Sequence, residues 1–588
     1  MELRATWSSA NALWHRRGRL SWIDAALVVG LAGLVAIVID FGREWKAPPQ
    51  AAASIDLHPT ALVQYTLFSL SRGVVAYVIS LAFTLVYGYW AAKDRIAQRV
   101  LVPLLDVLQS VPVLGFMPGV VLGLVAAFPN SNVGLELAAV IMIFTGQAWN
   151  MTFSFYYSLR SIPPDEQDVA RLYQFTWWQR LKWMEVPNAM MGLVWNSMMS
   201  MAGGWFFLMI IESFRLGERD FRLPGIGSYM SAAVDQGRVD AMLWAILAMT
   251  LMIVALDQLL WRPVVVWAQK FRVEDTAGYQ IASTSWFLNL LERSHILRAA
   301  QRVIEAAGSI ADRAAALTDR ARTGKFREEK PGGERPGAAF AGWISATLLI
   351  ALGGLLLFGA ARLVGLVWSV TFAEWKMTVA NGLITLGRVL ISVALGTLWA
   401  LPAGLAIGLS PRLSRVFQPV VQVIASFPAP MLFPLAIAGF TWAGVSLGWG
   451  SILLMLLGTQ WYILFNVIAG AMALPADLRE AATSYRLHGW RRFVMVYAAG
   501  VFPYLVTGWI TAAGGAWNAS IVAEYVTFRG EVLTARGLGS QINAAAQQAD
   551  FSLLAASLFV MSALVVVFNR TVWRRCYALA QDRFSLSK

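Results

Sequence analysis

The sequence predicts an all-α polytopic membrane protein made of two tandem six-helix domains. Three observations support this fold class: the composition, a series of apolar runs of membrane-spanning length, and an internal repeat. Of the 588 residues, 58% are hydrophobic and only 14% are charged, and the mean hydropathy is +0.58. A soluble domain of this composition would expose large apolar surfaces to water, so we expect the chain to lie in a bilayer.

Apolar runs close to the spanning length of about 20 residues recur along the whole chain. We predict six spans in the first half, at 22–41, 66–92, 108–128, 133–152, 189–211 and 241–261. The second half has six more, at 342–365, 383–409, 419–441, 446–470, 500–522 and 552–572. These runs predict a first domain at 1–269 and a second domain at 341–588.

One long polar segment, 270–340, separates the two predicted domains. Its apolar residues between Phe287 and Ala307 recur at helical spacing, and Lys330-Pro331-Gly332-Gly333 then breaks the pattern. We therefore expect a cytoplasmic amphipathic helix followed by a flexible linker. The simpler interpretation is a tether resting on the membrane surface or on the protein's own cytoplasmic face, and the alternative is a regulatory element.

An internal repeat relates the two halves. An offset of 316 residues relates Arg72 to Arg388, Pro103 to Pro419, Pro112 to Pro428 and Pro118 to Pro434. An offset of 312 residues relates Trp149 to Trp461, Pro163 to Pro475, Trp178 to Trp490, Arg180 to Arg492, Trp205 to Trp517, Glu212 to Glu524, Gly225 to Gly537 and Gly227 to Gly539. Because six is an even number of crossings, we expect a pseudo-twofold axis along the membrane normal, with a shared pathway between the halves.

The formal net charge of +13 raises the question of nucleic-acid binding, but the charge is segregated by loop. Basic residues follow the second, fourth and sixth predicted spans, whereas the Pro129-Asn130-Ser131-Asn132 loop carries none. This is the positive-inside pattern and predicts that both termini are cytoplasmic. The loop after the fifth span breaks the pattern with Arg215, Arg219 and Arg222. Membrane topology explains the charge bias, so no nucleic-acid partner is expected.

Cysteine and histidine usage argues against redox or metal chemistry. Cys576 is the only cysteine, and the four histidines are scattered over different loops rather than spaced as ligands. We therefore expect no metal site and no catalytic residue in this chain.

Two loops, after the fourth and tenth predicted spans, share an unusual composition. Each begins with a proline, continues with acids and alanines, and reaches a tryptophan ten residues beyond the last acid. Proline and carboxylates at the entry predict a helix start, because proline fixes φ and carboxylates meet the positive end of the helix dipole. Small alanines would let such a helix lie deep in a partner's groove, with the tryptophan as an anchor. The candidate docking residues are Asp165, Asp168, Ala170, Trp178 and Arg180 in the loop at about 160–187, and Asp477, Glu480, Ala481, Ala482, Trp490 and Arg492 in the loop at about 472–500.

Glu480-Ala481-Ala482 resembles the Glu-Ala-Ala loop of the membrane subunits of bacterial ATP-binding-cassette importers, and Asp168-Val169-Ala170 is a weaker copy. The glycine that the family has six residues after the acid is replaced here by Gln174 and Arg486. More narrowly, the sequence is similar to the nitrate, sulfonate, taurine and bicarbonate permeases. That similarity lies in Phe417-Gln418-Pro419-Val420-Val421-Gln422, Pro428, Pro434, Gly537-Leu538-Gly539 and Trp573-Arg574.

The resemblance implies two type I importer domains in one chain, located in the bacterial inner membrane and working by alternating access. It implies that each loop is a coupling helix held by one of two cytoplasmic ATPase subunits, with a periplasmic or lipid-anchored solute-binding protein as a further partner. The alternative for the loops is an ordinary amphipathic helix packed on its own bundle. No cofactor is expected in the chain itself, and ATP and magnesium would bind the partner ATPase. The only Gly-Lys pair, Gly324-Lys325, has Phe326 after it and Asp319 where a phosphate-binding loop needs glycine.

Six further polar or aromatic residues are candidates for the pathway or an outer gate. We expect Arg72 and Arg388 near the outer ends of their spans, where they either snorkel to the interface, the slightly favoured interpretation, or pair inside the bundle. Glu212 and Glu524 are either part of an outer gate or interfacial helix-end carboxylates. Trp205 and Trp517 either line the pathway or, as is more usual in a membrane span, only pack.

Two rivals from other classes remain. A secondary transporter can also use two parallel six-helix repeats, but it is expected to carry ionisable groups at mid-membrane, where these spans have few. A membrane-embedded enzyme is disfavoured because no cluster of His, Cys or carboxylate residues offers a catalytic arrangement.

Overall fold

The computed structural model describes residues 22–46, 55–216, 219–271, 285–299, 301–302, 338–528 and 531–584. The basic residues ahead of the first span, most of the predicted linker and the Gly324-Lys325 pair lie outside the described residues.

The first half is a series of helices interrupted by one β-hairpin. Its elements are α2 (Trp22–Lys46), α3 (Ala61–Lys93), α4 (Arg95–Ser110), α5 (Val113–Ala127), α6 (Val133–Arg160), α7 (Pro164–Leu172), α8 (Trp177–Arg180), η1 (Leu181–Glu185), α9 (Val186–Ile211), β1 (Ser213–Leu216), β2 (Arg219–Arg222), α10 (Ile226–Asp235), α11 (Val239–Leu256), η2 (Asp257–Trp261), α12 (Arg262–Ala268) and η3 (Gln269–Phe271). The short helix α13 (Trp286–Glu292) follows in the segment between the halves.

The second half repeats this order. Its elements are α15 (Ala338–Val367), α16 (Phe372–Leu409), α17 (Pro411–Ser426), η4 (Ala429–Leu432), α18 (Phe433–Trp442), α19 (Leu447–Met472), α20 (Ala476–Ser484), α21 (Gly489–Arg492), η5 (Phe493–Ala498), α22 (Ala499–Ala523), β3 (Tyr525–Phe528), β4 (Glu531–Thr534), α23 (Leu538–Gln547), α24 (Phe551–Phe568), η6 (Asn569–Trp573) and α25 (Arg574–Phe584). The two halves also share their π-helical turns. The turn η1 corresponds to η5, and η2 corresponds to η6.

Ten helices in the described ranges are long and apolar enough to cross a membrane, or up to twelve if each of two bent helix pairs is one span. The chain is therefore an all-α polytopic membrane protein in two tandem halves. The predicted spans at 108–128 and 419–441 fall on the bent pairs, so neither is a straight helix. The axes of Arg95–Gln109 and Val113–Ala127 meet at 96°, and those of Pro411–Ser426 and Ala429–Trp442 at 81°.

Proline explains both bends. Pro112 and Pro428 lie at the breaks, and the residue before each, Val111 or Phe427, has an extended backbone. Proline has no N–H to donate and its ring disfavours the helical conformation of the preceding residue, so α4 and α17 end there.

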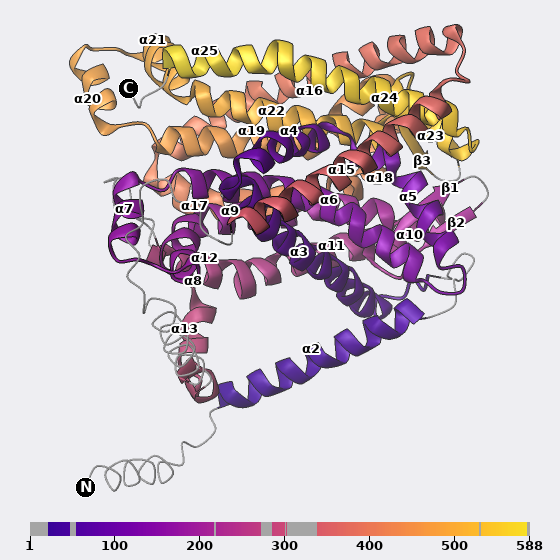
Figure 1. Cartoon of the computed structure of the whole chain (residues 1–588). Coiled ribbons are helices and arrows are strands. Elements are labelled where there is room, and N and C mark those ends of the chain that lie inside the picture. The colour runs from indigo at the N-terminus through magenta and orange to yellow at the C-terminus, as the bar shows by residue number, and fades with distance from the viewer. Residues whose placement is uncertain are drawn as a thin grey trace, which may run out of the picture.

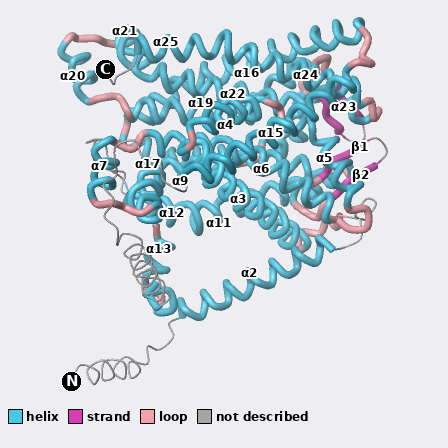
Figure 2. The backbone as a smooth tube through the Cα atoms, in the orientation of Figure 1, coloured by secondary structure: helices cyan, strands magenta, loops and turns pink. Residues whose placement is uncertain are grey.

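The expectation of helices alone is also incomplete, because each half has an antiparallel hairpin, β1–β2 and β3–β4. The first hairpin explains one of the three arginines that broke the charge pattern. Arg222 lies 2.9 Å from Asp220 and 2.8 Å from Asp235, so its charge is neutralised locally. Figure 2 shows both hairpins at one end of the molecule, opposite α7 and α20.

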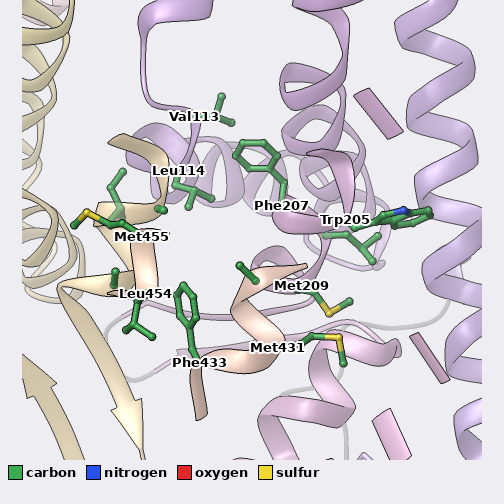
Figure 3. Packing of buried hydrophobic residues seen from close by; sticks show 14 of the residues in the cluster. Val113, Leu114, Trp205, Phe207, Met209, Met431, Phe433, Leu454 and Met455 are labelled. Carbon is green, nitrogen blue, oxygen red and sulfur yellow. The ribbon is translucent and has the colours of Figure 1, made fainter. Parts of the chain in front are cut away.

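The largest of three clusters of buried apolar residues in the described part of the chain spans both halves. Figure 3 shows Phe207 and Leu114 of the first half beside Phe433, Leu454 and Met455 of the second. The halves also share a hydrogen bond, in which the Val113 amide, at the bend before α5, donates to Asn518 Oδ1 of α22 at 2.8 Å. The bend thus exposes a backbone donor that the other half satisfies.

Helix α15 lies against the first half as well as its own. Ser345 Oγ donates to Asp94 Oδ2 at 2.5 Å and accepts from Trp90 Nε1 at 3.0 Å. Its counterpart α2 contacts its own half, where Asn132 donates to Glu44 and Gln64 donates to Asp40. The first spans of the two halves therefore pack differently.

The described part of the segment between the halves is anchored to α2. The buried carboxylate of Asp24 accepts from Ser294 Oγ at 2.6 Å and from the amides of His295 and Ile296 at 2.9 and 3.2 Å. Asp24 thus caps the start of the helical stretch 295–299, part of the predicted amphipathic helix.

We predict that Asn518→Ala weakens the contact between the halves. It would leave the buried Val113 amide without an acceptor, which typically costs about 1–3 kcal/mol, and the thermal unfolding midpoint of the purified chain should fall. Asn466→Ala is the matched control, because that amide donates only to the carbonyl of Tyr462 in its own helix. Equal midpoints for the two variants would contradict the assignment.

Candidate functional site

Two pairs of short helices lie at the end of the molecule opposite the hairpins (Figure 1). They are α7 with α8 in the first half and α20 with α21 in the second, and they coincide with the two predicted docking loops. We call them the docking helices. Both α7 and α20 follow a proline, Pro163 and Pro475, with identical φ and ψ of −55° and 142°.

The turns that follow α7 and α20 each contain one residue with a left-handed backbone. That residue stands where the importer family that the sequence resembles has glycine. Gln174 has a φ of 51° and Arg486 a φ of 50°. In the first half the Phe175 amide donates to the Ala170 carbonyl at 2.9 Å, and in the second the Leu487 amide donates to Ala482 at the same distance. The turn is therefore preserved without its glycine, at the cost of a strained backbone conformation.

The docking helices present apolar and acidic side chains to the exterior. Leu172, Tyr485 and Trp490 are 79%, 81% and 74% exposed. Trp178 is also exposed, and so are four predicted acids, Asp165, Asp168, Asp477 and Glu480. Large aromatic side chains in such exposure are typical of a surface that a partner covers.

The other predicted docking residues face the chain itself. Ala170 and Ala482 are buried and Ala481 is half-buried, which corrects the expectation that the alanines enter a partner's groove. Arg180 and Arg492 are half-buried, each with a buried Nε atom that has no hydrogen-bond partner. The guanidinium of Arg492 also lies over the Tyr497 ring, at 5.3 Å. Ala170 packs in a small apolar cluster with Phe155 and Leu159 of α6, which holds α7 to the bundle.

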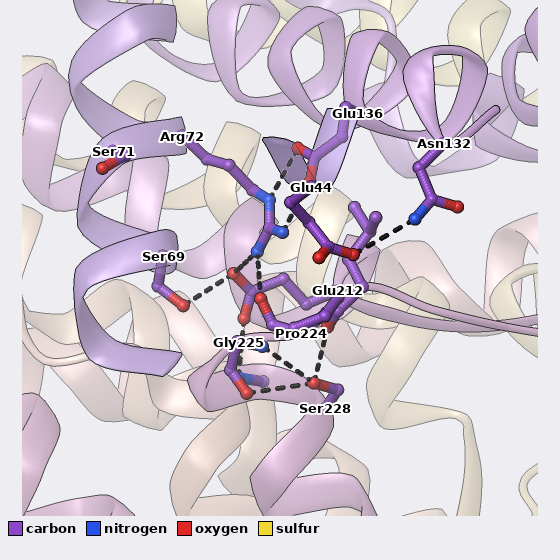
Figure 4. Close-up of polar contacts among 12 residues, drawn as sticks. Glu44, Ser69, Ser71, Arg72, Asn132, Glu136, Glu212, Pro224, Gly225 and Ser228 are labelled. Carbon is purple, nitrogen blue, oxygen red and sulfur yellow. Dashed lines mark hydrogen bonds and ion pairs between the residues drawn. The ribbon is translucent and has the colours of Figure 1, made fainter. Parts of the chain in front are cut away.

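At the hairpin end, Arg72 lies in a buried ion cluster (Figure 4). Its Nε and Nη2 atoms donate to the two carboxylate oxygens of Glu136 at 2.7 and 2.6 Å. Its Nη1 donates to Glu212 Oε1 at 2.8 Å and to the carbonyl of Pro224 at 2.7 Å. All three charged side chains are fully buried.

Glu212 in turn holds the start of α10. Its Oε2 accepts from the Gly227 amide at 2.7 Å and its Oε1 from Ser69 Oγ at 2.7 Å, and Ser69 accepts from the Ile226 amide at 2.9 Å. A Cβ atom on Gly225 would lie 2.3 Å from the Glu212 carboxyl carbon. Glycine is required there because the carboxylate approaches the backbone so closely.

The second half repeats this arrangement around Arg388. Its Nη1 donates to Glu524 Oε1 at 2.7 Å and to the Arg536 carbonyl at 2.8 Å. Glu524 also accepts from Thr385 Oγ1 at 2.9 Å and from the Gly539 amide at 2.8 Å. A Cβ atom on Gly537 would lie 2.3 Å from the Glu524 carboxylate.

The structure thus corrects two expectations from the sequence. Arg72 and Arg388 do not snorkel but pair with carboxylates inside the bundle. Glu212 and Glu524 are not interfacial carboxylates, since both are fully buried. The sequence analysis missed Glu136, because its repeat partner is Gly448 and only residues shared by both halves stood out.

Both repeated tryptophans, Trp205 and Trp517, are buried. A Cβ atom on Gly73 would lie 2.6 Å from Trp205, which shows how closely that ring approaches α3. Trp205 also lines a cavity of about 20 Å³ between the halves, with Gln422 and Ser426 of α17 on the other side. Trp517 is equally buried in α22. Among the described residues, no group of three or more His, Cys, Asp or Glu side chains could hold a metal.

The fold and the duplicated sites are those of a membrane permease built from two homologous domains. A family model described as "binding-protein-dependent transport system inner membrane component" matches the chain twice, at residues 84–260 and 392–572. The two matches cover more than half of the sequence, and the chain therefore belongs to this family.

Several curated permeases are similar to parts of the chain. The nitrate import permease protein of Leptolyngbya laminosa is 25% identical over 143 residues, 24% of this chain and 50% of that protein. The bicarbonate transport system permease protein of Synechocystis is 26% identical over 32% of this chain and 65% of its own length. The taurine transport system permease protein of Escherichia coli is 23% identical over 32% and 64%. The chain thus spans from half to just under two thirds of these relatives, and each matches only part of it.

We predict that Gly225→Ala and Gly537→Ala destabilise the chain, because a methyl group would displace the carboxylate that holds α10 or α23. Overpacking of this kind costs about 1–3 kcal/mol, and the thermal unfolding midpoint should fall by several degrees. Gly439→Ala is the control, since its Cβ would meet nothing within 4 Å. If all three variants have the same unfolding midpoint as the parent chain, the close approach of the carboxylate to the glycine turn does not contribute to stability.

We predict that Arg486→Gly stabilises the turn after α20 by about 1 kcal/mol, because glycine adopts a left-handed backbone without steric cost. Slower amide hydrogen exchange in α20 would measure the gain. Arg491→Gly, inside helix α21, should have the opposite effect. Faster exchange in α20 of Arg486→Gly would show that the turn is not strained.

Proposed function

We propose that this chain is the complete membrane channel of an ATP-binding-cassette importer, and that two separate ATPase subunits each bind one docking helix. The observation that carries the proposal is the duplication of exposed docking helices at one end of the molecule. The same entry proline, exposed acid, left-handed turn and exposed tryptophan occur in both halves. A duplicated surface of this kind fits a duplicated receptor.

Two continuous helices give the proposal a mechanical basis. In the first half, α8, η1 and α9 run without interruption from the docking helix to Glu212, and in the second α21, η5 and α22 run to Glu524. Each is a helical unit of 35 residues, about 50 Å long. A push on a docking helix would therefore reach the ion cluster at the hairpin end of the same half.

We propose alternating access as the mechanism, and the two continuous helices support it. ATP binding would close the two ATPases, bring the docking helices together and rotate the halves about their interface, which opens the pathway toward the hairpin end. ATP hydrolysis and release of the products would reverse the motion. The docking end would be cytoplasmic and both termini would lie on that side of the inner membrane.

We propose a small anion as the substrate, delivered by a periplasmic or lipid-anchored solute-binding protein. The support is the family's binding-protein dependence and the names of its relatives, which are nitrate, bicarbonate and taurine permeases. ATP and magnesium would be bound by the ATPase partners. The rival function, ion-coupled secondary transport, needs a carboxylate free to exchange its ion or proton. Glu212 and Glu524 are instead held by arginine, hydroxyl and backbone donors.

The test is charge reversal on both docking helices, Asp168→Lys with Glu480→Lys. The ATPases should no longer co-purify with the chain, and ATP-dependent uptake should be lost. Glu531→Lys is the matched control, because it reverses an exposed acid at the hairpin end and should leave the complex intact. Retention of both ATPases by the double variant would overturn the proposed docking surface.

A further inference from the structure

The two ion clusters differ in one respect that the repeat does not predict. In the first half, Nε and Nη2 of Arg72 form a two-pronged ion pair with Glu136. In the second half, Arg388 Nη1 has the same two kinds of acceptor as Arg72 Nη1, a glutamate and a backbone carbonyl. Within the described part of the chain, however, no acceptor pairs with Arg388 Nε or Nη2. One edge of the guanidinium is thus left open.

The open edge faces the position that the missing carboxylate would occupy. Gly448 is the counterpart of Glu136 at the same 312-residue offset as the neighbouring Trp149–Trp461 pair. A Cβ atom on Gly448 would meet only Arg388 Nη2 and Ser446 Oγ, each at 3.7 Å. The side chain of Arg388 is 12% exposed, whereas that of Arg72 is 0% exposed. The second half has therefore kept the arginine and lost the acid, and the position is accessible.

We propose that Arg388 and Ser446 form a binding site for an oxyanion that presents a pair of oxygens to the guanidinium edge, such as a carboxylate, bicarbonate, nitrate, sulfonate or phosphodiester group. The bound group takes the place that the Glu136 carboxylate has in the first half. Guanidinium binds such groups through two parallel N–H···O bonds, and the free Nε and Nη2 atoms supply that pair of donors. The inference rests on the cluster itself and does not require the proposed transport function.

The first half shows that this fold accommodates two negative charges beside the arginine. There, Arg72 forms ion pairs with two carboxylates, and the second of these, Glu212, has further donors in Ser69 and Gly227. Glu524 has the equivalent donors in Thr385 and Gly539. An added anion beside Arg388 would reproduce an arrangement that the fold already contains.

Occupancy would have a structural effect. Glu136 is in α6, so its ion pair fastens α3 to α6 permanently. An anion between Arg388 and the start of α19 would fasten α16 to α19 in the same way, but reversibly. The packing of the second half at the hairpin end would then depend on the anion.

The anion could come from solution or from a lipid headgroup, because Trp449, the residue after Gly448, is largely exposed and such side chains favour the membrane interface. The experiment separates these sources. In one arm, the purified full chain in neutral detergent is unfolded thermally with increasing nitrate, bicarbonate or methanesulfonate, at constant ionic strength with chloride. In the other, the chain is placed in phosphatidylcholine vesicles with or without phosphatidylglycerol.

In at least one arm, the added anion should raise the unfolding midpoint in a saturable way, because a ligand that binds only the folded chain stabilises it. Gly448→Glu should weaken that response at least about tenfold, the equivalent of one strong ionic contact, since its carboxylate occupies the site. Gly439→Glu is the matched control and should respond like the parent chain. A saturable response in detergent assigns a soluble anion, and one that needs phosphatidylglycerol assigns a lipid.

A reciprocal variant keeps the test decisive if Gly448→Glu folds poorly. Glu136→Gly opens the same edge on Arg72 and should add a second saturable response. The proposal is overturned if the parent chain responds in neither arm, or if Gly448→Glu folds and responds like Gly439→Glu.

Discussion

The contact between an arginine and the buried glutamate that ends a spanning helix fixes where three elements meet in each half. The arginine comes from α3 or α16, the glutamate from the end of α9 or α22, and the glycine turn from the start of α10 or α23. Charges removed from water are retained only when their hydrogen-bonding groups are satisfied. The glutamate of each half meets that requirement through the other two elements, which supply the arginine, a hydroxyl group and the amide of a glycine turn. The position of each element therefore depends on the others.

This constraint connects the two ends of the molecule. The docking helices lie at one end and the ion clusters at the other, and α9 and α22 reach from one to the other. A rigid helix transmits displacement, whereas π-helical turns such as η1 and η5 are places where its register can adjust. Both turns lie next to the docking helices, at the end of each helical unit that is far from the clusters.

The sequence predicts much of this architecture, for identifiable reasons. The apolar runs predict the spans. The residues that the internal repeat relates predict the two halves and the docking loops. The bends at Pro112 and Pro428 were missed because hydropathy does not register the direction of a helix axis. The pairing of Arg72 with Glu212 could not be derived, since their sequence separation says nothing about which helices become neighbours. The candidate acids were found at exposed positions, but the burial of Ala170 and Ala482 depends on tertiary packing.

Covalent fusion gives the difference between Glu136 and Gly448 a consequence for stoichiometry. A permease assembled from two copies of one subunit would carry two identical clusters, both closed or both open. Joining unlike halves in one polypeptide guarantees one of each in every molecule, whatever the level of expression. The order of the two halves in the chain therefore fixes which half carries the open cluster.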